Sequence, residues 1–138
     1  MATLRLEFVT PERSIAHDDV DEVVLPLADG YAGILPGHAP MLAAVRTGET
    51  WFRKGGQTTH GFVSGGFVEV TGDRVSVLAR IAERADDIDA ERAAAAKRRA
   101  EERIARPTMD MDMERARIGL LRAISRLDVA SRSSRPRR

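Results

Sequence analysis

The sequence predicts an α+β chain, with an N-terminal β-sandwich or flattened barrel followed by a C-terminal antiparallel two-helix hairpin. Two observations predict this division. Ten of the eleven glycines lie at or before Gly72, whereas most alanines of the second half form one block after Ala82. Short apolar runs separated by glycine and proline are typical of sandwiches, and alanine favours helix. We therefore expect a β-domain at residues 1–84 and a helical hairpin at residues 85–130.

Alternating residues and glycine turns predict the strands. Leu4, Leu6 and Phe8 alternate with polar residues, which places them on one face of a strand. Residues 21–25 form a second candidate strand, which Pro26 is expected to close. Two hairpins are expected because glycine adopts the positive φ that tight turns need. The first joins residues 50–54 to 57–60 through Gly55-Gly56, and the second joins 67–70 to 74–78 through Thr71-Gly72-Asp73.

Caps and spacing predict the two helices. Asp86 or Asp87 is expected to cap the first, which runs to about Arg106 because Pro107 stops it. Asp110 or Asp112 is expected to cap the second after a connection of about five residues. Apolar residues at intervals of three and four predict facing stripes. These are Ala93, Ala96, Ala100 and Ile104 on the first helix, and Met113, Ala116, Leu120, Ile124 and Leu127 on the second. Alanine buries little area, so the interface should be marginal.

Composition limits the classes of protein. The chain has no cysteine, which excludes disulfides and thiol catalysis. Neither a transmembrane segment nor a signal peptide is expected, which makes the cytoplasm the default compartment. The net charge of +1 conceals a basic end, because residues 115–138 hold eight arginines and one acid. Such an end suits an acidic partner. Residues 131–138 are expected to be a solvated, disordered tail.

Three segments of the chain have distinctive sequences. Residues 33–40 read Gly-Ile-Leu-Pro-Gly-His-Ala-Pro, and residues 63–70 read Val-Ser-Gly-Gly-Phe-Val-Glu-Val. Residues 82–93 read Ala-Glu-Arg-Ala-Asp-Asp-Ile-Asp-Ala-Glu-Arg-Ala. In this order they resemble a loop, a hairpin and the domain junction, with its Ile/Leu-Asp-x-x-Arg-Ala motif, of F-type ATP synthase epsilon subunits of the bacterial type. The resemblance covers residues 2 to about 130. One departure is Tyr31, which stands where the family usually has an acidic residue.

The resemblance implies a non-catalytic subunit. Its β-domain is expected to pack on the γ subunit and on the ring of c subunits. Its hairpin is expected either to fold against the β-domain or to extend along γ toward the catalytic α and β subunits, where the extended form inhibits ATP hydrolysis. The resemblance also implies peripheral attachment to the cytoplasmic face of the cell membrane, with membrane contact only through the complex.

ATP is the candidate regulatory ligand, since the folded form binds it in some bacterial family members, and no required cofactor is expected. The match to those members covers eight residues: Glu83, Ile88, Asp89, Arg92, Ala93, Arg99, Arg122 and Arg126. The guanidinium group suits phosphate because its planar fork donates paired hydrogen bonds. Spacings of seven and four residues place Arg92 with Arg99, and Arg122 with Arg126, on common helix faces. The alternative is that these are solvated side chains in an arginine-rich chain.

Each alternative function would require other features of the chain. A free-standing ATP-sensing module would use the same hairpin without a membrane complex. A nucleic-acid binder would use the basic end, but that end has no aromatic residue for base stacking. His17, His38 and His60 are scattered, so no metal site is expected. No phosphate-binding loop of the G-x-x-x-x-G-K-[ST] type and no G-x-S-x-G elbow is present, so an enzyme is the least favoured reading.

Overall fold

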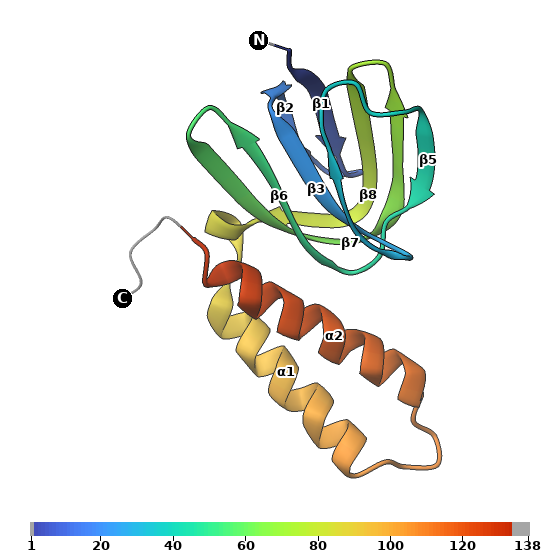
Figure 1. Cartoon of the computed structure of the whole chain (residues 1–138). Helices are drawn as coiled ribbons and strands as arrows, with labels where there is room; N and C mark the ends of the chain where they lie inside the picture. The colour runs from blue at the N-terminus through green and yellow to red at the C-terminus, as the bar shows by residue number, and fades with distance from the viewer. Residues whose placement is uncertain (1, 134–138) are drawn as a thin grey trace.

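The computed structural model describes residues 2–133. Eight strands form the β-domain, and the two helices lie together below it in Figure 1. The strands are β1 (Leu4–Val9), β2 (Ser14–Val20), β3 (Glu22–Leu27), β4 (Gly30–Ile34), β5 (Met41–Ala44), β6 (Gly48–Lys54), β7 (Gln57–Thr71) and β8 (Arg74–Arg84). A 3₁₀ turn, η1 (Ala85–Asp87), leads into α1 (Ala90–Ala105) and α2 (Met113–Ala130).

The strands are hydrogen-bonded in the order β2-β1-β8-β7-β6-β3-β4, with β5 on β7. All neighbours are antiparallel except β1 and β8, which run parallel with Arg5 opposite Arg74 and Val9 opposite Leu78. Over the described residues this path begins at β2 and ends at β4 without joining them. The expected sandwich is therefore confirmed, and its sheet is open rather than a closed barrel.

The core lies between the two faces of the folded sheet. Leu4, Leu6 and Phe8 are fully buried while Arg5 and Glu7 are not, as the alternation in β1 predicts. The same cluster includes buried residues of β2, β3, β6, β7 and β8, together with Ile34 of β4 and Val45, and Met41 and Ala43 of β5 pack against it. Strand β8 leads from this core through η1 into the helices.

Both expected hairpins are present, and two strand boundaries differ. Lys54 pairs with Gln57 around Gly55, and Thr71 pairs with Arg74, so the second turn holds only Gly72 and Asp73. Pro26 lies inside β3 rather than ending it. A proline is tolerated there because the β6 pairing of β3 stops at Val24, which leaves that side of the strand without a ladder.

The helix caps are partly as expected. Asp89, not Asp86 or Asp87, caps α1 by accepting the backbone N–H of Arg92, because Asp86 and Asp87 belong to η1. Asp112 caps α2 by accepting the N–H of Arg115. The connection between the helices spans residues 106–112. Both carboxylates satisfy backbone donors that the first turn of a helix leaves unpaired.

The interface between the helices is built mainly of alanine. Ala93 and Ala100 of α1 and Ala116 of α2 are buried, as the spacing predicts. Ile124 is 38% exposed, whereas the neighbouring Ala123 is buried, so the expected stripe is wrong at this position. Steps of three and of four residues both fit the helical period of 3.6. In α2 the step from Leu120 leads to Ala123 and not to Ile124, so the smaller side chain lies at the interface.

The hairpin is folded against the β-domain through the end of α2. Val129 is fully buried in a small cluster with Phe62 of β7 and Ala85 of η1. Beyond α2, Arg132 pairs with Glu49, and Ser133 donates a hydrogen bond to Asp86 at 2.8 Å. Residues 131–133 therefore contact the β-domain instead of starting a solvated tail, while residues 134–138 of that expected tail lie outside the described residues. Neither helix is long and apolar enough to cross a membrane.

Candidate functional site

A cleft of about 500 Å³ lies where the hairpin meets the β-domain. Its walls come from the β1–β2 turn, β8, the η1–α1 junction, α1 and α2. Its lining includes seven of the eight residues expected from the sequence: Glu83, Ile88, Asp89, Arg92, Ala93, Arg99 and Arg126. The cleft exists because the hairpin is closed, since residues of α1 and α2 face those of β8 across it.

The arrangement of α1 explains its side of the cleft. Arg92 and Arg99 are two turns apart on one helix, and Ala93 and Ala96 between them carry small side chains that leave space. Asp89 accepts the Arg92 N–H at 3.0 Å, which fixes the start of the helix at the mouth of the cleft. No side chain within residues 2–133 forms an ion pair with Arg92 or Arg99. Both guanidinium groups are thus available to an anion.

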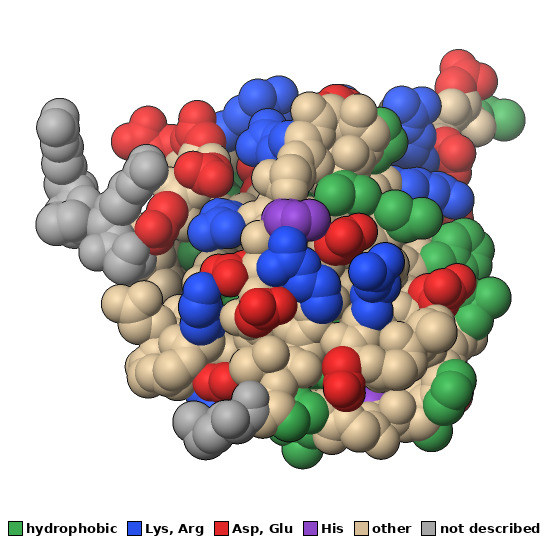
Figure 2. Space-filling view, turned by 90° about the horizontal axis from the view of Figure 1, so that it is seen from above, with side chains coloured by type: hydrophobic (Ala, Val, Ile, Leu, Met, Phe, Trp, Pro, Cys, Tyr) green, Lys and Arg blue, Asp and Glu red, His purple; other side chains and the backbone are tan. Residues whose placement is uncertain are grey.

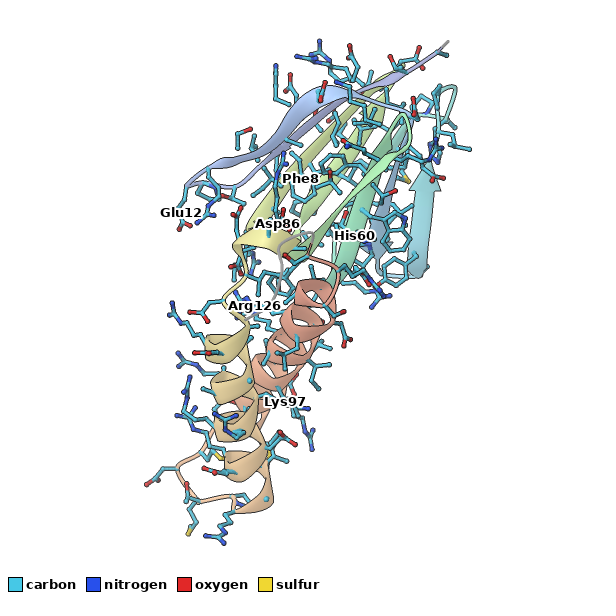
Figure 3. The ribbon with its side chains drawn as sticks, turned by 90° about the vertical axis from the view of Figure 1, so that its left-hand side faces the viewer. Phe8, Glu12, His60, Asp86, Lys97 and Arg126 are labelled. Atoms are coloured by element: carbon cyan, nitrogen blue, oxygen red, sulfur yellow. The ribbon has the colours of Figure 1, made fainter. Side chains whose placement is uncertain are left out.

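Arg126 joins the second helix to the β-domain. Its Nε donates to Glu83 Oε1 at 2.7 Å, and its guanidinium lies 4.5 Å from the centre of the Phe62 ring. Figure 3 shows Arg126 at the level where the hairpin meets the β-domain. A charge-assisted bond combined with a cation–π contact orients this side chain and its carboxylate partner at the inner end of the cleft.

Arg122 lies outside the cleft. Its Nε donates to Ser64 Oγ at 3.2 Å, and Ser64 in turn shares a hydrogen bond of 2.7 Å with Thr47. Arg122 and Arg126 share a face of α2 as expected. Arg126 lines the cleft, whereas Arg122 contacts β7 instead of facing α1. Three of the four expected arginines therefore line one space, and Arg122 does not.

The β1–β2 turn supplies lining residues that the sequence did not suggest. Thr10, Glu12 and Arg13 all line the cleft. The Thr10 hydroxyl accepts the N–H groups of Glu12 and Arg13 at 3.2 and 3.1 Å, which orders the turn. Thr-Pro at residues 10–11 is a recognisable turn signal, but no local pattern indicates that the turn faces α1, a helix that begins only at Ala90.

The cleft carries charges of both signs, and Arg126 is already paired with Glu83. Four arginines and four carboxylates line it. Three of the carboxylates, Glu83, Asp87 and Asp89, belong to the junction between β8 and α1, whereas Arg92 and Arg99 lie along α1. This arrangement suits a ligand with hydrogen-bond donors at one end and negative charge at the other. Within the described chain, no group of three or more His, Asp or Glu side chains could hold a metal ion.

Two further surfaces differ in character. Figure 2 shows acidic and basic side chains interleaved on the end of the β-domain away from the helices. Within the β-domain, Lys54 and Asp18 form an ion pair of 2.8 Å. A second surface, on β5, β7 and β8, carries three large apolar side chains: Leu42, Phe67 and Leu78 are 72, 59 and 60% exposed and line a common groove, which two glutamates and a serine also line. Scattered apolar residues are ordinary on a surface, but a contiguous group marks an interaction site.

Comparison with known proteins identifies the family. Residues 3–85 match the family model described as the β-sandwich domain of the ATP synthase delta/epsilon chain, and residues 86–131 match its long α-helix domain. The ATP synthase epsilon chain of Desulforamulus reducens is 48% identical over 128 residues, covering 93% of this chain and 97% of the relative. The epsilon chain of Bacillus licheniformis is also 48% identical, over 94% of this chain and 99% of the relative.

A solved structure has the same fold. A chain in the Euglena gracilis mitochondrial ATP synthase structure, described as OSCP/F1/c-ring, superposes with a TM-score of 0.80 at 22% identity over 91% of this chain and 79% of that one. The two family models together span nearly the whole chain, in the same order as the sandwich and the helices. The chain therefore belongs to the ATP synthase delta/epsilon family, as a non-catalytic subunit of the epsilon type.

Proposed function

We propose that this chain joins the γ subunit to the ring of c subunits in the central stalk and regulates ATP hydrolysis through its hairpin. In this proposal it attaches peripherally to the cytoplasmic face of the cell membrane through the complex. The folded hairpin binds ATP, and the extended hairpin reaches the α and β subunits and inhibits hydrolysis. Relatives nearly half identical over almost the full length support the assignment to the stalk.

The surfaces of the β-domain support docking. The exposed apolar group of Leu42, Phe67 and Leu78 suits a partner that buries it, and we assign it to γ. The loop at residues 36–40 is assigned to the ring of c subunits. That loop is held to the β7–β8 turn, because the Gly37 N–H donates to Asp73 at 3.2 Å. Tyr31 does not take part in that contact, because its ring lies 5.7 Å from Trp51 and its hydroxyl accepts the Glu49 N–H at 3.3 Å.

The cleft carries the proposal for ATP. Arg92 and Arg99 are unpaired within the described residues and line the same space as Glu83 and Asp89. The phosphates are assigned to the arginines, and the adenine amino group to the carboxylates, which accept hydrogen bonds. A volume of about 500 Å³ lies within the range of small-molecule pockets.

Ligand binding would stabilise the closed hairpin because the cleft exists only in that state. A ligand that binds the closed form alone stabilises it by about 2.7 kcal/mol at a hundredfold excess over Kd. The contacts between the helices are mostly alanine, so a change of this size is enough to shift the equilibrium. High ATP then favours the uninhibited state, and low ATP releases the hairpin.

Isothermal titration of the full chain with ATP tests the binding. Arg92→Ala and Arg99→Ala should each weaken ATP binding about tenfold or more, because each removes charge-assisted hydrogen bonds. Arg126→Ala is a poorer test, since Arg126 also holds Glu83 and packs on Phe62. Arg74→Ala is the matched control, because Arg74 is exposed and lies at the β7–β8 turn. No heat at millimolar ATP would defeat the proposal.

Removal of residues 88–138 tests the regulation. The truncated chain should still assemble with the complex through its β-domain, and the rate of ATP hydrolysis by the complex should rise. Steady-state hydrolysis by purified complexes, with subunit content checked on a gel, measures both. Unchanged hydrolysis in a fully assembled complex would rule out the inhibitory role.

A further inference from the structure

The β1–β2 turn brings a charged side chain to the cleft from the β-domain. Arg13 lines the cleft together with Arg92 and Arg99, although it comes from a segment far from both in the sequence. Figure 3 shows this turn, marked by Glu12, reaching toward the start of α1. The cleft thus has basic side chains on the β-domain as well as on the hairpin.

The backbone that carries Arg13 is well ordered. The Thr10 hydroxyl accepts two backbone N–H groups of the turn, and the Thr10 N–H donates to the Arg13 carbonyl at 2.9 Å. Two residues later, buried Ile15 anchors the start of β2 in the core. The position of Arg13 at the cleft is therefore set by the fold, and only its side chain remains to be oriented by a ligand.

The guanidinium of Arg13 is free, in contrast to most arginines of the β-domain. Arg5 and Arg53 pair with carboxylates, and Arg84 donates to the Ile15 carbonyl. Its backbone bonds to Thr10, but the Arg13 guanidinium has no ion pair or hydrogen bond with any residue from 2 to 133, including the adjacent Glu12. All five donors of its guanidinium are available.

We infer that Arg13 binds a phosphate group of the nucleotide, so that the ligand bridges the β-domain and the hairpin. This inference rests on the proposed ATP site. Phosphate is the part of a nucleotide that an unpaired guanidinium contacts most strongly, through paired charge-assisted bonds. A ligand held by Arg13 on one side and Arg92 on the other ties the two domains together directly, beyond holding the two helices to each other.

The experiment compares nucleotide affinities of the full chain by isothermal titration. Arg13→Ala should weaken ATP binding about tenfold or more and should weaken AMP binding less, because AMP has a single phosphate. Arg13→Lys should recover part of the loss, since lysine keeps the charge but not the fork. Arg74→Ala should bind ATP as the wild type does. Unfolding of Arg13→Ala without nucleotide should match the wild type, because Arg13 is exposed.

Other results would overturn the inference in different ways. If Arg92→Ala loses ATP and Arg13→Ala does not, the inference fails and the ATP site stands. If Arg13→Ala weakens ATP and adenosine equally, Arg13 contacts the nucleoside and not a phosphate, and the inference fails. If the wild type does not bind ATP at all, the inference and the proposed site fail together.

Discussion

Gly66 is the residue at which the backbone of the β-domain leaves least room. Its φ is +118°, and a Cβ built there would lie 2.1 Å from the Leu78 carbonyl oxygen on β8. Gly66→Ala should therefore lower the free energy of unfolding by at least about 2 kcal/mol, through backbone strain and the displacement of β8. Urea denaturation followed by circular dichroism measures this.

Gly119→Ala is the matched control for that substitution. Gly119 lies inside α2, and a Cβ there would meet nothing within 4 Å. The substitution should raise stability by roughly 0.5–1 kcal/mol, because alanine has the higher helix propensity. A loss of stability at position 119, or none at position 66, would contradict the local geometry.

A second prediction at this scale concerns Asp18. The hydrogen bond from Lys54, together with the backbone N–H of Asp19, lowers the pKa of the Asp18 carboxyl below its ordinary value of 3.8. A lowered pKa contributes stability above the ordinary value, and this contribution disappears as the pH falls through the pKa of the folded state. Lys54→Gln should therefore be less stable than the wild type at pH 6, and the difference should shrink below pH 3.8.

Denaturation curves across this pH range measure the effect. Lys97→Gln is the control, because Lys97 lies on α1 and has no ion pair within the described part of the chain. A Lys54→Gln difference that does not change with pH would show that Asp18 is not the group responsible.

At the scale of elements, the closed hairpin has a small apolar cluster against the β-domain at the end of α2, beside the polar contacts of Arg122 and Arg126. Val129 is fully buried against Phe62 and Ala85, whereas the interface between the helices is mostly alanine. Val129→Ala should destabilise the docked hairpin by roughly 1–3 kcal/mol, because apolar burial is lost and a cavity is left behind. The hairpin should then open from the β-domain. The β-domain should remain folded.

Hydrogen exchange of the full chain measures this prediction by element. Protection should fall in α1 and α2 and stay unchanged in β7 and β8. Ile118→Ala, at a side chain 41% exposed, should change little. Equal loss of protection in the strands and the helices would show that the chain unfolds as one unit.

The sequence predicts the elements better than their limits. The alternation in β1, both glycine turns and the Asp112 cap follow from local chemistry, and the structure has all of them. Local rules could not choose the cap of α1, because Asp86, Asp87 and Asp89 are equally good cap residues. The 3₁₀ turn η1 includes Asp86 and Asp87, which leaves Asp89 as the cap. Pro26 was expected to end a strand. It is tolerated inside β3 because β6 does not pair with that part of the strand, which only the assembled sheet determines.

The candidate site divides in the same way. Arg92 and Arg99 share a helix face, which spacing predicts, whereas Arg122 bonds Ser64 because of how α2 is turned against β7. Arg13 could not be found from any local pattern, since its place beside α1 is set only when the β-domain folds. Spacing predicts which residues share a face of one helix, whereas Glu83 and Arg126 were expected only from the family resemblance.

At the scale of the whole molecule, the proposed docking on γ depends on the apolar group of β5, β7 and β8. Phe67→Asp should weaken binding to γ at least tenfold by placing a charge in an apolar contact, while stability changes little because the side chain is 59% exposed. Pull-down with purified γ measures this. Leu121→Asp is the control on α2, at a side chain 50% exposed. If only Leu121→Asp lost binding, the interface with γ would lie on the hairpin and not on the β-domain.

The parallel pairing of β1 with β8 has a mechanical consequence. Strand β8 leads directly into the hairpin, and along its first half it is hydrogen-bonded on both sides, to β1 and to β7. These bonds run roughly across the strands, so a pull along β8 loads many of them at once instead of breaking them one after another. In Figure 1 the hairpin is connected to the β-domain through this strand. A force transmitted through residues 85–89 would therefore act on the sheet as a shear load. The helices would detach from the β-domain before β8 slipped out of the sheet.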